Sequence, residues 1–182
     1  MRVFAVLCVI AGLAAGPAQA QEQRETNTLS GRASASVVQP LRVAAVEDLS
    51  FGTVMLQRGQ GGEIIISETG SETTYTGALH PICRSGSSCA AHRARFAVSG
   101  QNNRDYGIGL PLRLPVTGHT TGTHLSIDRL SAASAASPSL GVAGRTDDAG
   151  HDSFSVGGSL QVPAGSKADQ YRGDLTVTVF YY

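Results

Sequence analysis

Histidine, cysteine and clustered aspartate are the side chains of this sequence that could do chemistry, and their spacing does not favour catalysis. The loop that contains Asp147, Asp148, His151 and Asp152 lacks the D-x-[DN]-x-[DN]-G order of a calcium-binding loop. No two histidines have a spacing that would fix two metal ligands; they are His80, His92, His119, His124 and His151. We therefore expect no metal and no cofactor, with the histidines in exposed loops and the acidic loop solvated.

The sequence also lacks the motifs that place a nucleophile, a phosphate or a catalytic metal. It has no Gly-x-Ser-x-Gly elbow, no phosphate-binding loop and no His-Glu-x-x-His. Its 22 glycines lie at expected turns and strand ends, not ahead of a helix. We predict that the protein is not an enzyme.

The first twenty residues have the pattern of a secretory signal peptide. Arg2 is followed by an apolar run and then by Pro17-Ala-Gln-Ala20, which ends in an A-x-A cleavage site. We expect the mature chain to begin at Gln21, with a mobile extension over residues 21–32 and a single domain over residues 33–182. The protein would be exported through the inner membrane to the periplasm, and then to the cell surface or beyond.

Two cysteines remain after this cleavage, Cys83 and Cys89, and in an exported protein an even number of cysteines predicts a disulfide. The short loop implies only roughly 2 to 2.5 kcal/mol of stabilisation. No later run of apolar residues is long enough for a membrane span. The 14 basic and 14 acidic residues are scattered, which argues against a nucleic-acid partner.

The elements that would position any site are β-strands, and the clearest one ends the chain. Every second residue of this stretch is apolar, aromatic or Gly: Tyr171, Gly173, Leu175, Val177, Val179 and Tyr181. Such alternation predicts a half-buried strand. Because the sequence stops there, one edge of this strand has no later segment to cover it, and exposed edges pair with other chains.

About nine or ten short strands follow one another in the sequence, with no stretch of helical periodicity. We predict an all-β, immunoglobulin-like β-sandwich, with a closed barrel as the structural alternative. Residues 107–117 read as one strand whose Pro111 and Pro115 remove backbone donors along a single edge, so this strand should border a gap. Residues 131–152 read mostly as loop.

A further alternating segment precedes Pro40, with Leu29, Gly31, Ala33, Ala35 and Val37 in one phase. This segment is either the first strand of its own domain or a strand given to a neighbour. The residues alone leave both readings open.

The ending Tyr171-Arg-Gly-Asp-Leu-Thr-Val-Thr-Val-Phe-Tyr-Tyr182 resembles the C-terminal strand of chaperone–usher pilus subunits, in which Tyr181 matches the penultimate aromatic residue. Together with Leu49-Ser-Phe-Gly52 and Ala33-x-Ala-x-Val-Val-x-Pro-Leu41, it is similar to small exported β-sandwich proteins of Gram-negative bacteria related to common-pilus major subunits and spore-coat-U-like proteins. The Cys83 to Cys89 loop departs from the pilin disulfide, which joins more distant strands.

The resemblance implies a sandwich that is incomplete and is completed by donor-strand exchange. A periplasmic chaperone would fill the gap, until the N-terminal extension of a neighbouring subunit, delivered at an outer-membrane usher, replaces it. The protein would then be a structural subunit of a surface fibre. The alternative is a self-complete exported β-sandwich that binds a ligand or carbohydrate at the cell surface through its loops.

Overall fold

The computed structural model of the protein describes residues 32, 34–70, 72–84, 87 and 89–182. The expected signal peptide, and all of the expected extension except Arg32, lie outside these residues. By its contacts the chain divides into residues 1–36 and residues 37–182, and the second unit contains every strand that the structure describes.

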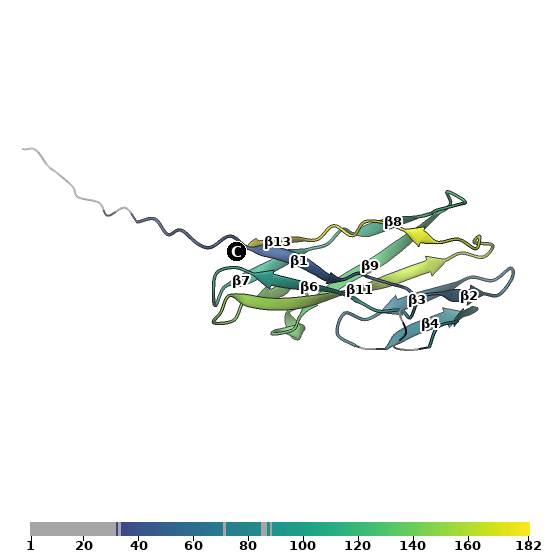
Figure 1. Ribbon diagram of the computed structural model, residues 1–182, viewed down its shortest axis with the longest axis horizontal. Helices are drawn as coiled ribbons and strands as arrows, with labels where there is room; N and C mark the ends of the chain where they lie inside the picture. Colours follow the sequence, from purple (N-terminus) through teal and green to yellow (C-terminus); the bar gives the residue numbers. More distant parts are fainter. Residues whose placement is uncertain (1–31, 33, 71, 85–86, 88) are drawn as a thin grey trace, which may run out of the picture. The chain divides into compact units, whose positions relative to one another are not determined.

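The larger sheet is antiparallel and has β11 (His151–Val162) at its centre (Figure 1). On one side β11 pairs with β9, and on the other it pairs first with β6 and then with β3. The remaining strands extend the sheet outward from these. Its other members are β1 (Arg42–Glu47), β3 (Gly62–Ile66), β4 (Thr73–Gly77), β6 (Ala94–Ser99), β8 (Arg113–Gly118), β9 (His124–Ser134) and β12 (Tyr171–Arg172).

A second, three-stranded sheet contains β10 (Ala143–Arg145), β7 (Asp105–Gly109) and β13 (Thr178–Tyr181), in that order. A pair, β2 (Val54–Leu56) and β5 (Leu79–Pro81), stands apart, and η1 (Pro138–Leu140) is a single 3-10 turn. The predicted all-β, sandwich-like fold is confirmed.

The main core lies where β6, β9 and β11 of the larger sheet face β7 of the smaller one. Its fully buried members are Ala94, Val98, Tyr106, Ile108, Ala132, Phe154 and Val156. The rings of Phe96 and Phe154, which lie opposite each other on β6 and β11, stack with centroids 5.0 Å apart. The core is therefore built mainly from small and β-branched side chains around one aromatic pair.

One polar cluster is enclosed in this core. The Tyr106 hydroxyl donates to Asp152 Oδ2 over 2.8 Å, and Ser134 Oγ donates to the same oxygen over 2.6 Å. Burial, and next the adjacent Asp152 carboxylate, raise the pKa of Tyr106 far above its ordinary value. The cluster joins β7, β9 and β11 across both sheets.

The prediction of one strand over residues 107–117 is wrong. β7 belongs to the small sheet and β8 to the large one, so the chain crosses between sheets at residues 110–112. Leu112, which shares the apolar phase, is 96% exposed at this crossing. Alternation indicates which residues share a face but not where a chain changes sheets.

Pro115 nevertheless lies beside a gap in backbone pairing. The His119 N–H bonds to the Gln170 carbonyl, and residues of equal parity point their N–H groups to the same side of a strand. On the side of β8 that faces the terminal segment, Pro115 therefore has no backbone N–H to donate. Beside it, residues 173–177 carry no strand assignment, whereas β12 and β13 on either side do.

The expectation of loop over residues 131–152 is also wrong in part. β9 continues to Ser134, β10 occupies residues 143–145, and β11 already begins at His151. Ala132 and Ala133 are buried by the neighbouring strands, although their small side chains give no apolar periodicity. Neighbouring strands can hold a weakly patterned segment in a sheet.

Candidate functional site

The terminal segment has the alternation that its sequence predicts. Its odd-numbered side chains from Leu175 to Tyr181 pack against the main core, while the even-numbered ones are exposed. Tyr171 is half-buried in a separate cluster, and Gly173 is exposed. The inward phase is therefore right, but the segment is not one strand: β12 pairs with β8 in the large sheet and β13 pairs with β7 in the small one.

β13 presents an unpaired backbone edge. Among the described residues it pairs with β7 alone. The Ile108 N–H bonds to the Val142 carbonyl, so the alternate residues Gly107 and Gly109 face β13. Their partners are Phe180 and Thr178, which leaves the N–H and C=O of the intervening Val179 directed away from β7.

Within the described residues β1 pairs with β6 alone, so it presents a second unpaired edge, and all of its residues are exposed. Val43 lies opposite Val98 on β6, and side chains opposite each other in an antiparallel pair share a face. Val98 is 2% exposed in the core, yet Val43 on the same face is 36% exposed. Ala45, opposite the half-buried Phe96, is exposed as well. No described residue therefore covers the core-facing side of β1 fully.

The free backbone groups of β1 fall on these same two residues. The Gly100 N–H bonds to Gly150 of the β11 side, so Ser99 and Ala97 face β1. They lie opposite Arg42 and Ala44, and the N–H and C=O of Val43 and Ala45 point to the open edge. We call Val43, Ala45, Val177, Val179 and Tyr181 the open rim.

The two edges of the open rim meet at Tyr181. Its hydroxyl accepts the Gln101 N–H over 2.6 Å and donates to the Gln39 carbonyl over 3.2 Å. The hydroxyl lies against Gly100, where any Cβ would overlap it. Tyr181 thus links the end of the last strand to the residues that lead into the first.

The segment predicted to act as a donor strand is described only in part. Leu29, Gly31 and Ala33 lie outside the described residues. Ala35 and Val37 are described, and both are exposed and outside any strand.

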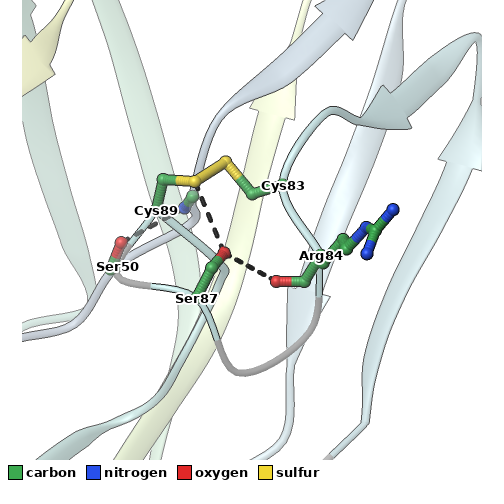
Figure 2. Close-up of a disulfide and its surroundings, with 6 residues drawn as sticks. Ser50, Cys83, Arg84, Ser87 and Cys89 are labelled. Carbon is green, nitrogen blue, oxygen red and sulfur yellow. Dashed lines mark hydrogen bonds between the residues drawn. A yellow bond between two sulfur atoms is a disulfide. The ribbon is translucent and has the colours of Figure 1, made fainter.

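The predicted disulfide between Cys83 and Cys89 is present (Figure 2). Ser87 Oγ lies 3.4 Å from the Cys89 sulfur and donates to the Arg84 carbonyl over 2.7 Å. The Thr53 N–H bonds to the Cys89 carbonyl. The bridge therefore fixes the chain beside the segment that enters β2, in a part of the molecule that does not include the open rim.

The acidic loop does not bring its side chains together. Asp147 Oδ1 accepts the N–H groups of Ala149 and His151, and backbone hydrogen bonds, first that of His151, lower the pKa of Asp147. Asp148 Oδ1 accepts a hydrogen bond from the side-chain amide of Asn103, and Asp152 belongs to the core cluster. Within the described ranges, no group of three or more His, Cys, Asp and Glu side chains is arranged to hold a metal.

Two open hollows, of about 210 and 300 Å³, lie beside β4 and share Glu72, Thr73 and Ala91. The wall of the first carries both acidic and basic residues and contains the His92 ring, 3.4 Å from the Glu47 carboxylate. These are shallow surface features and offer no enclosed site for a small molecule.

Sequence reasoning identified one side of the open rim and missed the other. The alternation of Leu41, Val43 and Ala45 is visible in the sequence, but it suggests an ordinary buried face. That these side chains are uncovered depends on which strands lie next to β1. The Tyr181 contact with Gln39 joins residues 142 positions apart, and no local pattern predicts it.

In the part of the chain that the structure describes, no helix has the length and apolarity needed to cross a membrane. Residues 41–181 match the model of a domain of unknown function, DUF4402. The match runs from the residue before β1 to the end of β13 and leaves residues 29–37 outside it. No curated protein and no solved structure matches the sequence.

Proposed function

The chain belongs to the DUF4402 family, and we propose that it is a pilin-like structural subunit of a bacterial surface fibre, completed by a β-strand from another chain. The inserted strand would lie along the open rim, between β1 and β13. The observation that carries the proposal is the exposure of Val43 and Ala45 on the core-facing side of β1.

The backbone supports strand addition as the mode of binding. Both edges of the open rim carry N–H and C=O groups that have no ladder partner among the described residues, and an added strand would pair with them. Its inward side chains would cover Val43 on one side and Val179 on the other, both of which are incompletely buried. Burial of one large apolar side chain contributes about 1.5 to 3 kcal/mol, so a few such side chains suffice for stable capture.

The partners follow from the same interpretation. A signal peptide over residues 1–20 would direct the chain to the periplasm, where a chaperone strand would cover the open rim. At an outer-membrane usher, residues 29–37 of a neighbouring subunit would replace the chaperone. Leu29 and Val37 would contribute most to the exchange, because the alanines and Gly31 bury little area.

The test is capture of a synthetic peptide of residues 27–38 by the full chain as it refolds from denaturant. We expect folded protein with bound peptide, and in the absence of peptide SDS-resistant multimers that dissociate on heating. A peptide with Asp at positions 29 and 37 is the control and should not bind. A stable monomer that ignores both peptides would contradict the proposal and favour the self-complete, ligand-binding sandwich.

A matched pair of variants locates the site. Val43→Glu places a charge where the added strand must cover it, so peptide affinity should fall at least about 30-fold, equivalent to about 2 kcal/mol. Val46→Glu is the control, because Val46 is 66% exposed and does not belong to the open rim. Equal affinities for the two variants would place the bound peptide elsewhere.

A further inference from the structure

The outer edge of β4 is a further surface with unpaired backbone groups. Among the described residues β4 pairs with β3 alone. The Ala78 N–H bonds to the carbonyl of Gly61, just before β3, so the even-numbered residues of β4 face β3. The N–H and C=O of Thr73 and Tyr75 are therefore directed to the open edge.

The side chains of β4 do not protect this edge. Exposed edges are usually blunted by charged side chains, prolines or bulges. β4 consists of Thr73-Thr-Tyr-Thr-Gly77, has no charge and no proline, and pairs with β3 in continuous register. By contrast, β1 carries Arg42, Glu47 and a register shift, and β10 ends in the charged Arg145. β-Branched and aromatic residues also favour strand pairing, so β4 is a ready template for another strand.

The two open hollows beside β4 leave room for the side chains of such a strand. Thr73 lines both hollows, and the larger, of about 300 Å³, is also lined by Tyr75 and Cys83. The Tyr75 side chain packs against a core cluster on this face of β4 and yet remains partly exposed. Side chains that lie opposite one another on paired strands share a face. The inward side chains of an added strand would therefore cover Tyr75 beside the hollow.

We propose that β4 pairs with β4 of a second copy, antiparallel and about a two-fold axis at Thr74. Thr73 then lies opposite Tyr75 of the second copy, so the residues with free backbone groups bond to one another in both symmetric pairs. Thr74 faces Thr74 of the second copy, and Glu72 faces Thr76, so like charges are not opposed. The edge is therefore complementary to itself in backbone bonding and in charge.

The neighbouring register is less favourable. An axis at Tyr75 would pair Thr73 with Gly77, whose φ of 71° takes its backbone out of the strand conformation. A two-fold pair is also closed, because it consumes the β4 edge of both copies. Two short strands make a small interface, so we expect a weak dimer in exchange with the monomer. The inference is independent of the proposed function, since β4 does not belong to the open rim.

Oxidative cross-linking of the full chain tests the register. Opposite residues in a non-hydrogen-bonded antiparallel pair have Cα atoms about 4.5 Å apart, which suits a disulfide. Thr74→Cys should give a reducible covalent dimer at least about tenfold faster than Thr76→Cys, the matched control, whose Cα atoms would be far apart. Both side chains are exposed on the same face of β4. An excess of the 27–38 peptide keeps association through the open rim out of the measurement.

Sedimentation velocity measures the dissociation constant of the dimer. Thr73→Pro removes an N–H that β3 does not use, so the fold should be retained. The constant should rise roughly 30-fold, about fivefold for the hydrogen bond lost from each symmetric pair. Thr76→Lys places a cation opposite Glu72 of the second copy and should lower the constant about threefold, whereas Thr74→Lys opposes two cations and should raise it about threefold.

The outcomes separate this inference from the proposed function. Equal cross-linking of Thr74→Cys and Thr76→Cys, or a folded Thr73→Pro variant that associates like the wild type, overturns the β4 dimer. Peptide capture without a Thr74→Cys dimer overturns it as well and leaves the proposed function standing. A Thr74→Cys dimer in protein that ignores the peptide supports the β4 dimer and contradicts only the proposed function.

Discussion

Tyr106→Phe tests the buried polar cluster that joins the two sheets. The ring of Tyr106 is fully buried, and its hydroxyl donates to a carboxylate oxygen of Asp152 that also accepts from Ser134. The substitution removes one oxygen atom and leaves the ring in place. It therefore isolates the hydrogen bond from the packing.

The expected loss follows from the charge of the acceptor. A hydrogen bond to a charged group contributes about 1.5 to 3 kcal/mol, more than a bond between neutral groups, and Asp152 would keep the Ser134 hydroxyl and the Ser153 N–H. We expect Tyr106→Phe to lower the free energy of unfolding by about 2 kcal/mol at pH 7. Ser134→Ala should cost a similar amount, and the double variant less than the sum, because both donors share one oxygen.

Equilibrium urea unfolding at fixed protein and peptide concentrations measures these differences, read from the midpoint at an unchanged m-value. Tyr182→Phe is the control and should stay within about 0.5 kcal/mol of the wild type. A loss below about 0.5 kcal/mol for Tyr106→Phe, or strictly additive single variants, would refute the view that Asp152 is the acceptor that holds the two sheets together.

Three further predictions follow from the same structure. Val177→Arg should abolish accumulation of the protein in the periplasm, measured by immunoblotting of fractionated cells, because it turns an unpaired charge toward the core; normal levels would contradict the inward phase of the terminal segment. Replacing Cys83 and Cys89 by Ser should lower the free energy of unfolding by roughly 2 to 2.5 kcal/mol. Peptide capture should not change, since the disulfide lies in a different part of the molecule from the open rim. Loss of capture in a variant of full stability would contradict this separation of the disulfide from the open rim. Asp169 accepts hydrogen bonds from the Thr121 hydroxyl and from several backbone N–H groups, and these lower the pKa of Asp169. The contribution of its carboxylate to folding stability is therefore complete above the ordinary aspartate pKa of about 3.9. It is lost as the pH falls through the depressed value. Asp169→Asn should therefore lower the Tm at pH 7, with a deficit that shrinks below about pH 4; a constant deficit across this range would exclude the carboxylate charge as its cause.

The phase of the terminal segment could be predicted from local sequence. Alternation placed Leu175, Val177, Val179 and Tyr181 toward the core because side chains of a strand point to opposite faces in turn, whatever the strand pairs with. The two cysteines after the expected signal peptide predicted the disulfide for an equally local reason, since they lie only six positions apart.

The sheet to which each strand belongs was decided by tertiary structure. The apolar phase of residues 107–117 is continuous, yet the chain leaves the small sheet after Gly109 and enters the large one at Arg113. The terminal segment makes the corresponding change between β12 and β13. A two-residue period carries no information about the strand alongside, and for that reason no pattern marked either crossing.

The open rim shows the same division most clearly. Sequence indicates that Val43 and Val179 have apolar, core-directed positions, but exposure depends on what lies next to them. In the part of the chain that the structure describes, β1 and β13 are each paired on one side only. The hydrogen bond between Tyr181 and Gln39 joins residues from opposite ends of the domain. Contacts between residues so distant in sequence arise only when both sheets have packed, and the uncovered edge between them is therefore a property of the tertiary structure.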